Sequence, residues 1–171
     1  MSRQKDDWYP TPAYATEALL EVEGFGSLVW EPACGDGAIS KVLEKWGMQT
    51  KNCDLNDYGF GTTGVDFLLE TERLASSIVT NPPYKLATDF IHQAINLGVE
   101  KHAWLLRLSF LEGIARHKRL YQLFPPARVW VFSKRLTIWR GDQEVNGSGT
   151  TAYAWFIWER GKYEDTKIGW I

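Results

Sequence analysis

Short apolar runs alternate with amphipathic stretches along most of the chain. Runs with the length and composition of buried strands are predicted at 27–30, 49–55, 64–68, 77–80, 103–110, 128–133 and 151–159. Helical spacing of apolar residues predicts helices between them, at 12–22, 38–46, 70–75, 85–97 and 112–124. The alternation of strands with helices predicts a Rossmann-like α/β fold, in which a mostly parallel, doubly wound sheet carries helices on both faces.

A turn at the end of the predicted strand 77–80 carries the first candidate chemistry. It reads Asn81, Pro82, Pro83, Tyr84, and two prolines in succession cannot continue a strand. Asn81 offers an amide oxygen and Pro82 a carbonyl, both hydrogen-bond acceptors, and Tyr84 offers a flat ring for stacking. Two acceptors beside a stacking face suit the exocyclic amine of a planar substrate. The alternative is an ordinary proline turn capped by Asn81.

A glycine-rich turn follows the predicted strand 27–30. It reads Glu31-Pro-Ala-Cys-Gly-Asp-Gly37 and leads into a helix, which is the nucleotide-binding arrangement at the carboxyl edge of a parallel sheet. The turn lacks the Gly-Lys-Ser/Thr ending of a phosphate loop. Its acids, Glu31 and Asp36, would repel a pyrophosphate and attract a sulfonium and an amino group.

Acidic residues also follow two later strands. Asp54 lies about twenty residues after the glycines, where doubly wound folds place a carboxylate on ribose hydroxyls. Asp66 could accept a hydrogen bond from an adenine amino group. The alternative for Asp54 is a plain turn residue at the end of a strand.

The segment before the first helix combines aromatic residues with prolines. Trp8 and Tyr9 are either core aromatics or the wall of a ligand site. Thr11 is predicted to cap the helix, with Pro12 at its first position.

Composition limits the class of protein. The 171 residues predict one domain, 1–171, and their 23% charged and 44% hydrophobic content is that of a globular protein. With no long apolar run and only two cysteines, we expect no membrane span, no metal site and a reducing, cytoplasmic location.

Charge is distributed unevenly along the chain. Residues 1–100 hold 7 Lys and Arg against 15 Asp and Glu, whereas 101–171 hold 12 against 6. An acidic half and a basic half suggest one face for a cationic small molecule and another for a polyanion. A chance imbalance of solvated charges is the alternative.

Together these motifs resemble class I S-adenosylmethionine-dependent methyltransferases. Their order and spacing are similar to those of the small phage- and prophage-type DNA adenine-N6 methyltransferases, over nearly the whole chain. The resemblance implies seven strands with an antiparallel pair at the sheet edge. It implies that the residues Asn81, Pro82, Pro83 and Tyr84 form the catalytic loop and that S-adenosylmethionine is the cofactor.

The same resemblance implies a set of cofactor-binding residues, in which Asp54 binds the ribose and Asp66 the adenine. The set comprises Trp8, Tyr9, Pro10, Thr11, Glu31, Pro32, Ala33, Gly35, Asp36, Gly37, Asp54, Leu55, Asp66, Phe67 and Asn81.

Basic residues in the second half are candidates for nucleic-acid contact. One group, Arg116, Lys118 and Arg119, lies on a predicted helix, and the other, Lys134, Arg135, Trp139 and Arg140, precedes a glycine hinge. A solvated helix face and an ordinary edge loop are the alternatives. The chain lacks a separate target-recognition region, which predicts relaxed sequence preference.

The expected reaction is methyl transfer to the N6 amine of a flipped adenine in DNA. Single-stranded DNA and RNA are alternative substrates, and the protein is expected to be a monomer or a homodimer. Three other functions remain open: a glutamine-N5 methyltransferase with a similar motif, a non-enzymatic cofactor- or nucleic-acid-binding module, and an NAD-linked dehydrogenase. The acidic glycine turn disfavours the last.

Overall fold

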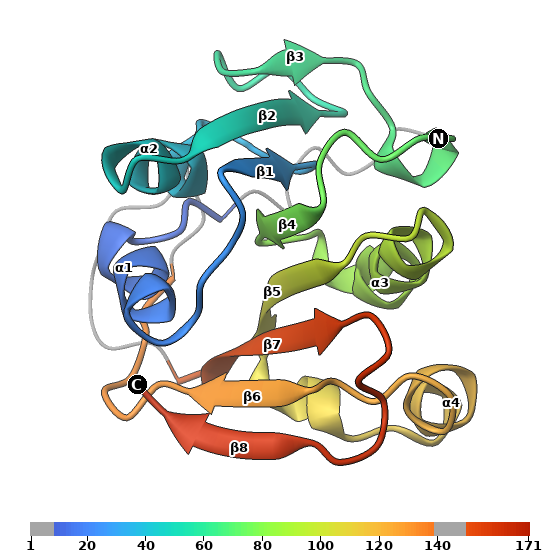
Figure 1. Cartoon of the computed structure of the whole chain (residues 1–171). Coiled ribbons are helices and arrows are strands. Elements are labelled where there is room, and N and C mark those ends of the chain that lie inside the picture. The colour runs from blue at the N-terminus through green and yellow to red at the C-terminus, as the bar shows by residue number, and fades with distance from the viewer. Residues whose placement is uncertain (1–8, 139–149) are drawn as a thin grey trace.

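A twisted sheet forms the middle layer of the protein (Figure 1). The computed structural model describes residues 9–138 and 150–171, and in that part of the chain the sheet has eight strands in the order β3-β2-β1-β4-β5-β7-β6-β8. The strands are β1 (Leu28–Glu31), β2 (Gln49–Asp54), β3 (Thr62–Thr63), β4 (Ser77–Thr80), β5 (Lys101–Arg107), β6 (Arg128–Val131), β7 (Tyr153–Glu159) and β8 (Lys167–Trp170).

The sheet is parallel except at β7. That strand runs antiparallel to both of its neighbours, β5 and β6, whereas β8 pairs in parallel with β6. The predicted α/β class and mostly parallel sheet are therefore confirmed. Two details differ from the prediction: the described chain adds β8, giving eight strands rather than seven, and the antiparallel strand lies inside the sheet rather than at its edge.

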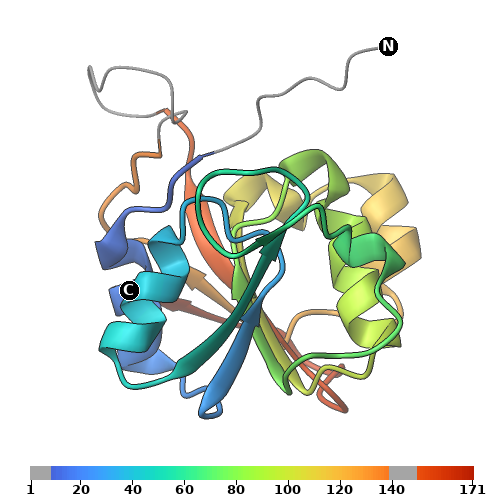
Figure 2. The same cartoon turned by 90° about the horizontal axis from the view of Figure 1, so that it is seen from above.

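Helices cover both faces of the sheet (Figure 2). Helices α1 (Ala13–Val22) and α2 (Ala38–Lys45) pack on one face, and α3 (Ala87–Asn96) and α4 (Ile114–Arg116) lie on the other. A π-helical turn, His117–Tyr121, continues α4. Alternate residues of β5 enter the two resulting cores, because successive side chains of a strand point to opposite faces: Ala103 and Leu105 face α1 and α2, while Trp104 and Leu106 face α3.

Two predicted elements between β2 and β4 are wrong. In place of a strand at 64–68, the chain has the short β3 and then a 3-10 turn, Phe67–Leu69. Asp66 caps that turn by accepting a hydrogen bond from the Leu68 amide at 3.1 Å. The predicted helix at 70–75 is absent, and the segment is irregular. Both segments are short, and apolar runs of this length do not distinguish a strand from a turn.

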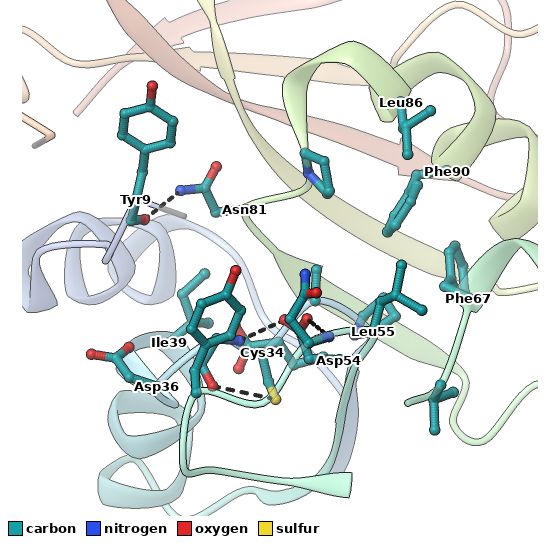
Figure 3. A pocket seen from close by; sticks show the side chains of 18 of the residues that line it. Tyr9, Cys34, Asp36, Ile39, Asp54, Leu55, Phe67, Asn81, Leu86 and Phe90 are labelled. Carbon is teal, nitrogen blue, oxygen red and sulfur yellow. Dashed lines mark hydrogen bonds between the residues drawn. The ribbon is translucent and has the colours of Figure 1, made fainter. Parts of the chain in front are cut away.

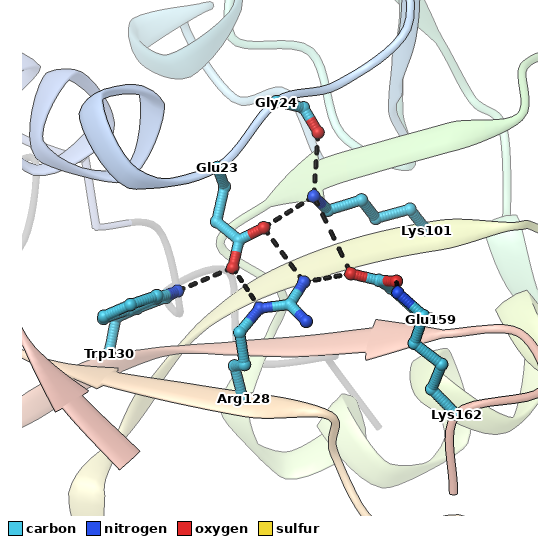
Figure 4. Close-up of polar contacts among 7 residues, drawn as sticks. All are labelled: Glu23, Gly24, Lys101, Arg128, Trp130, Glu159 and Lys162. Carbon is cyan, nitrogen blue, oxygen red and sulfur yellow. Dashed lines mark hydrogen bonds and ion pairs between the residues drawn. The ribbon is translucent and has the colours of Figure 1, made fainter. Parts of the chain in front are cut away.

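An ion-pair network joins α1 to the sheet at the amino ends of the parallel strands (Figure 4). The buried carboxylate of Glu23 accepts hydrogen bonds from Lys101 at 2.5 Å, from the Trp130 indole at 2.7 Å and from Arg128. Burial alone would raise the pKa of Glu23, but these donors together hold it below its ordinary value. Arg128 also pairs with Glu159, so the network fixes the end of α1 against three strands.

None of the helices in 9–138 and 150–171 combines the length and the apolar character needed to cross a bilayer.

Candidate functional site

A cavity of about 750 Å³ opens at the carboxyl ends of β1, β2 and β4 (Figure 3). Strand β1 pairs with β2 on one side and with β4 on the other. The order in which the chain adds strands to the sheet therefore reverses at β1. Such a switch point is where open α/β sheets bind ligands.

Most of the predicted cofactor residues border this cavity. They are Tyr9, Pro10, Thr11, Glu31, Pro32, Ala33, Gly35, Asp36, Asp54, Leu55, Asp66, Phe67 and Asn81. Trp8 lies outside the described residues, and Gly37 does not line the cavity. That these residues hold a cofactor stays a prediction.

The glycine turn is shaped by the end of β2. Gly35 has φ 53° and donates its amide to Asp54 Oδ2 at 2.9 Å, which ties the turn to β2. Gly37, with φ 80°, begins α2, and a Cβ on it would lie 2.7 Å from the Phe60 ring. Gly37 therefore acts through close packing beneath Phe60 in this structure.

Asp54 is held at the floor of the cavity. Its second oxygen, Oδ1, accepts from the Asn56 amide at 2.9 Å, and the side chain is buried. Burial raises the pKa of Asp54, and the backbone amides oppose that rise. Each carboxylate oxygen has a further lone pair, so Asp54 can still accept from ligand hydroxyls.

The two acids of the glycine turn have different surroundings. Glu31 is buried, accepts hydrogen bonds from the Ser40 amide at 3.0 Å and from the Ser40 hydroxyl, and has its pKa raised well above the ordinary value by burial. Asp36 is partly exposed and accepts from the Ala38 amide at 3.2 Å. Of the two, Asp36 is therefore better placed to offer negative charge to a ligand.

Asn81 is oriented by the segment before α1. Its amide nitrogen donates to the Tyr9 carbonyl and to the Thr11 hydroxyl, both at 3.2 Å. These acceptors fix which end of the amide faces them, because a carbonyl oxygen can receive only from the nitrogen. Asn81 Oδ1 is then left buried without a hydrogen bond from the described chain.

This contact corrects the prediction for Thr11. The helix begins at Ala13 with Pro12 as its N-cap, and no side chain caps it. The hydroxyl of Thr11 instead accepts a hydrogen bond from Asn81.

Tyr84 lies beside Asn81 but outside the cavity wall. Its ring centroid is 5.7 Å from that of Tyr9 and 6.1 Å from that of Tyr153. Burial raises the pKa of Tyr84 well above its ordinary value, whereas Arg107 and Asn81, which lie close to it, act in the opposite direction. Of the two prolines, Pro83 borders the cavity and Pro82 is buried.

The cavity has an apolar end that sequence reasoning mostly missed. Leu86 and Phe90 line it together with Phe67 and Leu55 (Figure 3). Leu86 and Phe90 follow the turn 81–84 at helical spacing, a signal that predicts core packing equally well. Other lining residues outside the predicted sets are Cys34, Ala38, Ile39, Asn56, Tyr58, Val65, Leu68 and Lys85.

The predicted nucleic-acid residues are in different surroundings. Arg116 donates to the carbonyls of Phe110 and Glu112 and lies over the Phe110 ring, so it stabilises the turn before α4. Arg119 pairs with Asp89 at 3.6 Å.

The remaining members of the set are exposed, or they lie outside the described residues. Lys118 and Lys134 are exposed, and Arg135 donates to the Thr150 carbonyl at 3.0 Å. Trp139 and Arg140 fall outside the described residues. Lys134 and Arg135 follow β6, whose carboxyl end is at the same edge of the sheet as the cavity.

Metal-ligating side chains do not gather at the site. Within residues 9–138 and 150–171, no three His, Cys, Asp or Glu side chains are grouped so that they could hold a metal ion.

Comparison with known proteins identifies the fold. No protein-family model matches the chain, and no curated protein matches it in sequence. Solved structures do match. A protein from Listeria monocytogenes, described as a class I S-adenosylmethionine-dependent methyltransferase, superposes with a TM-score of 0.64 at 10% identity, over 93% of this chain and 62% of its own.

Two further structures extend the likeness to proteins linked to nucleic acid. A type I restriction enzyme modification subunit from Vibrio vulnificus YJ016 has a TM-score of 0.61 at 12% identity, over 93% of this chain but 45% of its own. A protein from Pyrococcus horikoshii described as an RNA methyltransferase has a TM-score of 0.62 at 13% identity, over 88% of this chain and 85% of its own. The chain thus spans less than two thirds of the first two proteins, and what it shares with all three is the fold of the class I S-adenosylmethionine-dependent methyltransferases.

Proposed function

We propose that the protein transfers a methyl group from S-adenosylmethionine to the N6 amine of adenine in DNA. The single observation that carries this proposal is the amide of Asn81. Its nitrogen is occupied by Tyr9 and Thr11, and its oxygen is buried beside the cavity without a hydrogen-bond partner among residues 9–138 and 150–171. A buried acceptor without a donor is costly, so this oxygen suits a ligand that brings an N–H group.

The residues of the cavity fit the proposed cofactor. Asp54 lies at the end of β2 with lone pairs left for ribose hydroxyls, and Asp36 can offer negative charge near the glycine turn. The apolar end formed by Phe67, Leu86 and Phe90 suits a flat adenine ring. When bound, S-adenosylmethionine supplies a methyl group that its sulfonium already activates.

The chain's own contribution is the placement of the acceptor amine. Asn81 Oδ1 and the Pro82 carbonyl would accept from the amine hydrogens, which would direct the nitrogen lone pair toward the methyl group. The N–C bond would form as the S–C bond breaks, S-adenosylhomocysteine would leave, and the methylated amine would release one proton to solvent. Positive charge develops on that nitrogen during transfer, so both acceptors bind the transition state more strongly than the ground state. Tyr84 offers its ring to the adenine, and positioning in line supplies most of the acceleration.

A polynucleotide is the favoured kind of substrate because its adenines carry the matching amine and because cations follow β6, which ends at the same edge of the sheet as the cavity. Lys134 and Arg135 lie there, and phosphate contacts of this kind position a nucleic acid without specifying a sequence. Contacts of this kind predict a relaxed sequence preference. The expected site is an unpaired or easily flipped adenine.

The deciding assay incubates the protein with radiolabelled S-adenosylmethionine and single-stranded DNA, duplex DNA, RNA or protein, followed by nucleoside analysis. We expect N6-methyladenine in DNA, spread over many sequence contexts. Label in RNA or in protein glutamine would replace the proposed acceptor class, and N4-methylcytosine would overturn the adenine assignment. Modification confined to one strict motif would overturn the relaxed preference.

A variant pair tests the role of Asn81. Asn81→Ala should reduce the transfer rate by a factor on the order of 10²–10³, because it removes a preorganised acceptor. Affinity for S-adenosylmethionine, measured by calorimetry, should stay close to that of the wild type. The matched control is Asn96→Ala, at the exposed end of α3, which should change neither quantity. Full activity of Asn81→Ala would refute the proposed chemistry.

A further inference from the structure

Arg107 occupies the approach to the ring on which the proposed acceptor base would stack. It is the last residue of β5, and its guanidinium carbon lies 5.0 Å from the centroid of the Tyr84 ring. This separation is that of a cation–π contact.

The remaining surroundings of Tyr84 leave little other room for a base. Its ring packs against both hydrophobic cores and is flanked by Tyr9 and Tyr153 at tilts of 35° and 40°. Arg107, by contrast, is exposed, so the side of Tyr84 that it covers is the side toward solvent. A base that reaches Asn81 and stacks on Tyr84 has to enter from there.

Arg107 is also free to move when a base arrives. Its backbone is held in the pairing of β5 with β7, but its side chain makes no hydrogen bond or ion pair with residues 9–138 or 150–171, and the contact with Tyr84 is the interaction that places the guanidinium. An exposed cation–π contact is weak, so a neutral base can compete for the ring at small cost.

On the basis of the proposed adenine acceptor, we propose that Arg107 selects a polynucleotide over a free nucleoside. In this structure its guanidinium covers Tyr84. An entering base displaces it, and the displaced guanidinium then binds a phosphate next to the target nucleotide, for which its planar donors are suited. A free nucleoside must also displace the guanidinium from Tyr84, but it has no phosphate to which Arg107 could then bind.

The inference predicts effects of opposite sign for two probes in one variant. Arg107→Ala should bind 2-aminopurine deoxyriboside about twofold to fivefold more tightly than the wild type, because the competing cation–π contact is gone. The same variant should bind a single-stranded oligonucleotide containing 2-aminopurine more weakly, by roughly fivefold to tenfold, with a flatter salt dependence. Both affinities are read from the fluorescence quenching of the stacked probe.

Two further variants separate this role from a general loss of charge or structure. Arg160→Ala removes an exposed arginine at the opposite edge of the sheet, next to the end of β7, and should leave both affinities unchanged. Arg107→Lys keeps the charge but loses the planar donors, so its oligonucleotide affinity should fall between those of the wild type and Arg107→Ala.

The outcomes distinguish this inference from the proposed function. Weaker or unchanged binding of both probes by Arg107→Ala would overturn the role of Arg107, even if DNA methylation is observed. Absence of quenching with both probes in the wild-type protein, together with no transfer to DNA, would overturn the proposed function itself.

Discussion

Asn81 depends for its orientation on two residues outside the tetrapeptide in which it lies. Tyr9 provides a carbonyl and Thr11 a hydroxyl, and both are about seventy positions away in sequence. The same amide therefore joins the segment before α1 to the turn that follows β4. Because an amide can rotate to satisfy whichever partners it meets, these two acceptors determine which atom faces the ligand.

Thr11 is consequently expected to act as a positioning residue. Thr11→Val keeps the shape of the side chain but removes the acceptor, which should lower kcat by about tenfold, the equivalent of roughly one hydrogen bond. The affinity for S-adenosylmethionine should change little, and Thr11→Ser should restore most of the activity. Steady-state kinetics and calorimetry measure the two effects.

Thr16→Val is the matched control for that change. The Thr16 hydroxyl is buried on α1 and makes no hydrogen bond with the described chain, so its loss should leave kcat intact. An equal loss of activity in both variants would show that Thr11 acts through packing rather than through Asn81.

At the scale of elements, β8 is held to the sheet by a close contact between Gly169 and Trp130. A Cβ on Gly169 would lie 2.2 Å from Cζ3 of the Trp130 ring, so the indole lies directly across the glycine. The Trp130 indole nitrogen also donates to Glu23, at 2.7 Å. One side chain thus joins β6, β8 and the end of α1.

Gly169→Ala should loosen β8 because the indole must shift away from its bond with Glu23. We expect the free energy of unfolding to fall by about 1–3 kcal/mol, the usual cost of overpacking. Urea titration measures the loss. Gly24→Ala, where a Cβ would meet no atom within 4 Å, is the control and should change stability little. Equal stabilities of the wild type and Gly169→Ala would contradict the packing described for Trp130.

At the scale of the whole molecule, charge is divided between the two edges of the sheet. Acids of the first half line the cavity at the carboxyl edge, among them Asp36 and Asp66. Several cations of the second half, Lys101, Arg128 and Lys162, lie in the network at the opposite edge. Part of the basic excess of the second half therefore neutralises Glu23 and Glu159 rather than facing a polyanion.

Acid should destabilise the fold through a buried histidine in the middle of the sheet. His102 is buried in β5, its Nδ1 accepts from the Trp104 indole at 2.6 Å, and burial lowers its pKa to about 3. In the unfolded chain the imidazole binds a proton near the ordinary histidine pKa of about 6.5. In the folded protein the buried imidazole stays neutral at that pH. The stabilisation from neutral His102 is therefore complete above about pH 6.5 and is lost as the pH falls toward 3.

A difference measurement isolates this contribution. Glu31, whose pKa is raised by burial, has the opposite effect in an overlapping range, because there the folded state holds a proton that the unfolded state releases. His102→Gln keeps an acceptor for Trp104 but cannot titrate. Between pH 7 and pH 4 we expect the unfolding free energy of the wild type to fall relative to that of His102→Gln. A difference between the two that is constant over this range would show that His102 binds protons equally in both states.

The sequence by itself determined the α/β class and the positions of most strands. The reason is that apolar runs such as 77–80 and 103–110 alternate with amphipathic stretches, and this alternation favours strands buried on both faces of a mostly parallel sheet. The sequence also predicted that the motifs gather at one edge of the sheet, because the carboxyl ends of parallel strands meet at the same edge. The glycine turn, Asp54 and Asn81 could be assigned to one site for that reason alone.

Only the tertiary structure decided how these residues are used. Local pattern could not show that β8 would extend the sheet, that Thr11 would serve Asn81 instead of a helix, or that Arg116 would hold a turn. It gave no sign that Arg107 would cover Tyr84. Each of these contacts joins segments through side chains whose partners are set by the packing of whole elements, and a hydrogen-bonding or cationic side chain carries no local signal of which partner it will find.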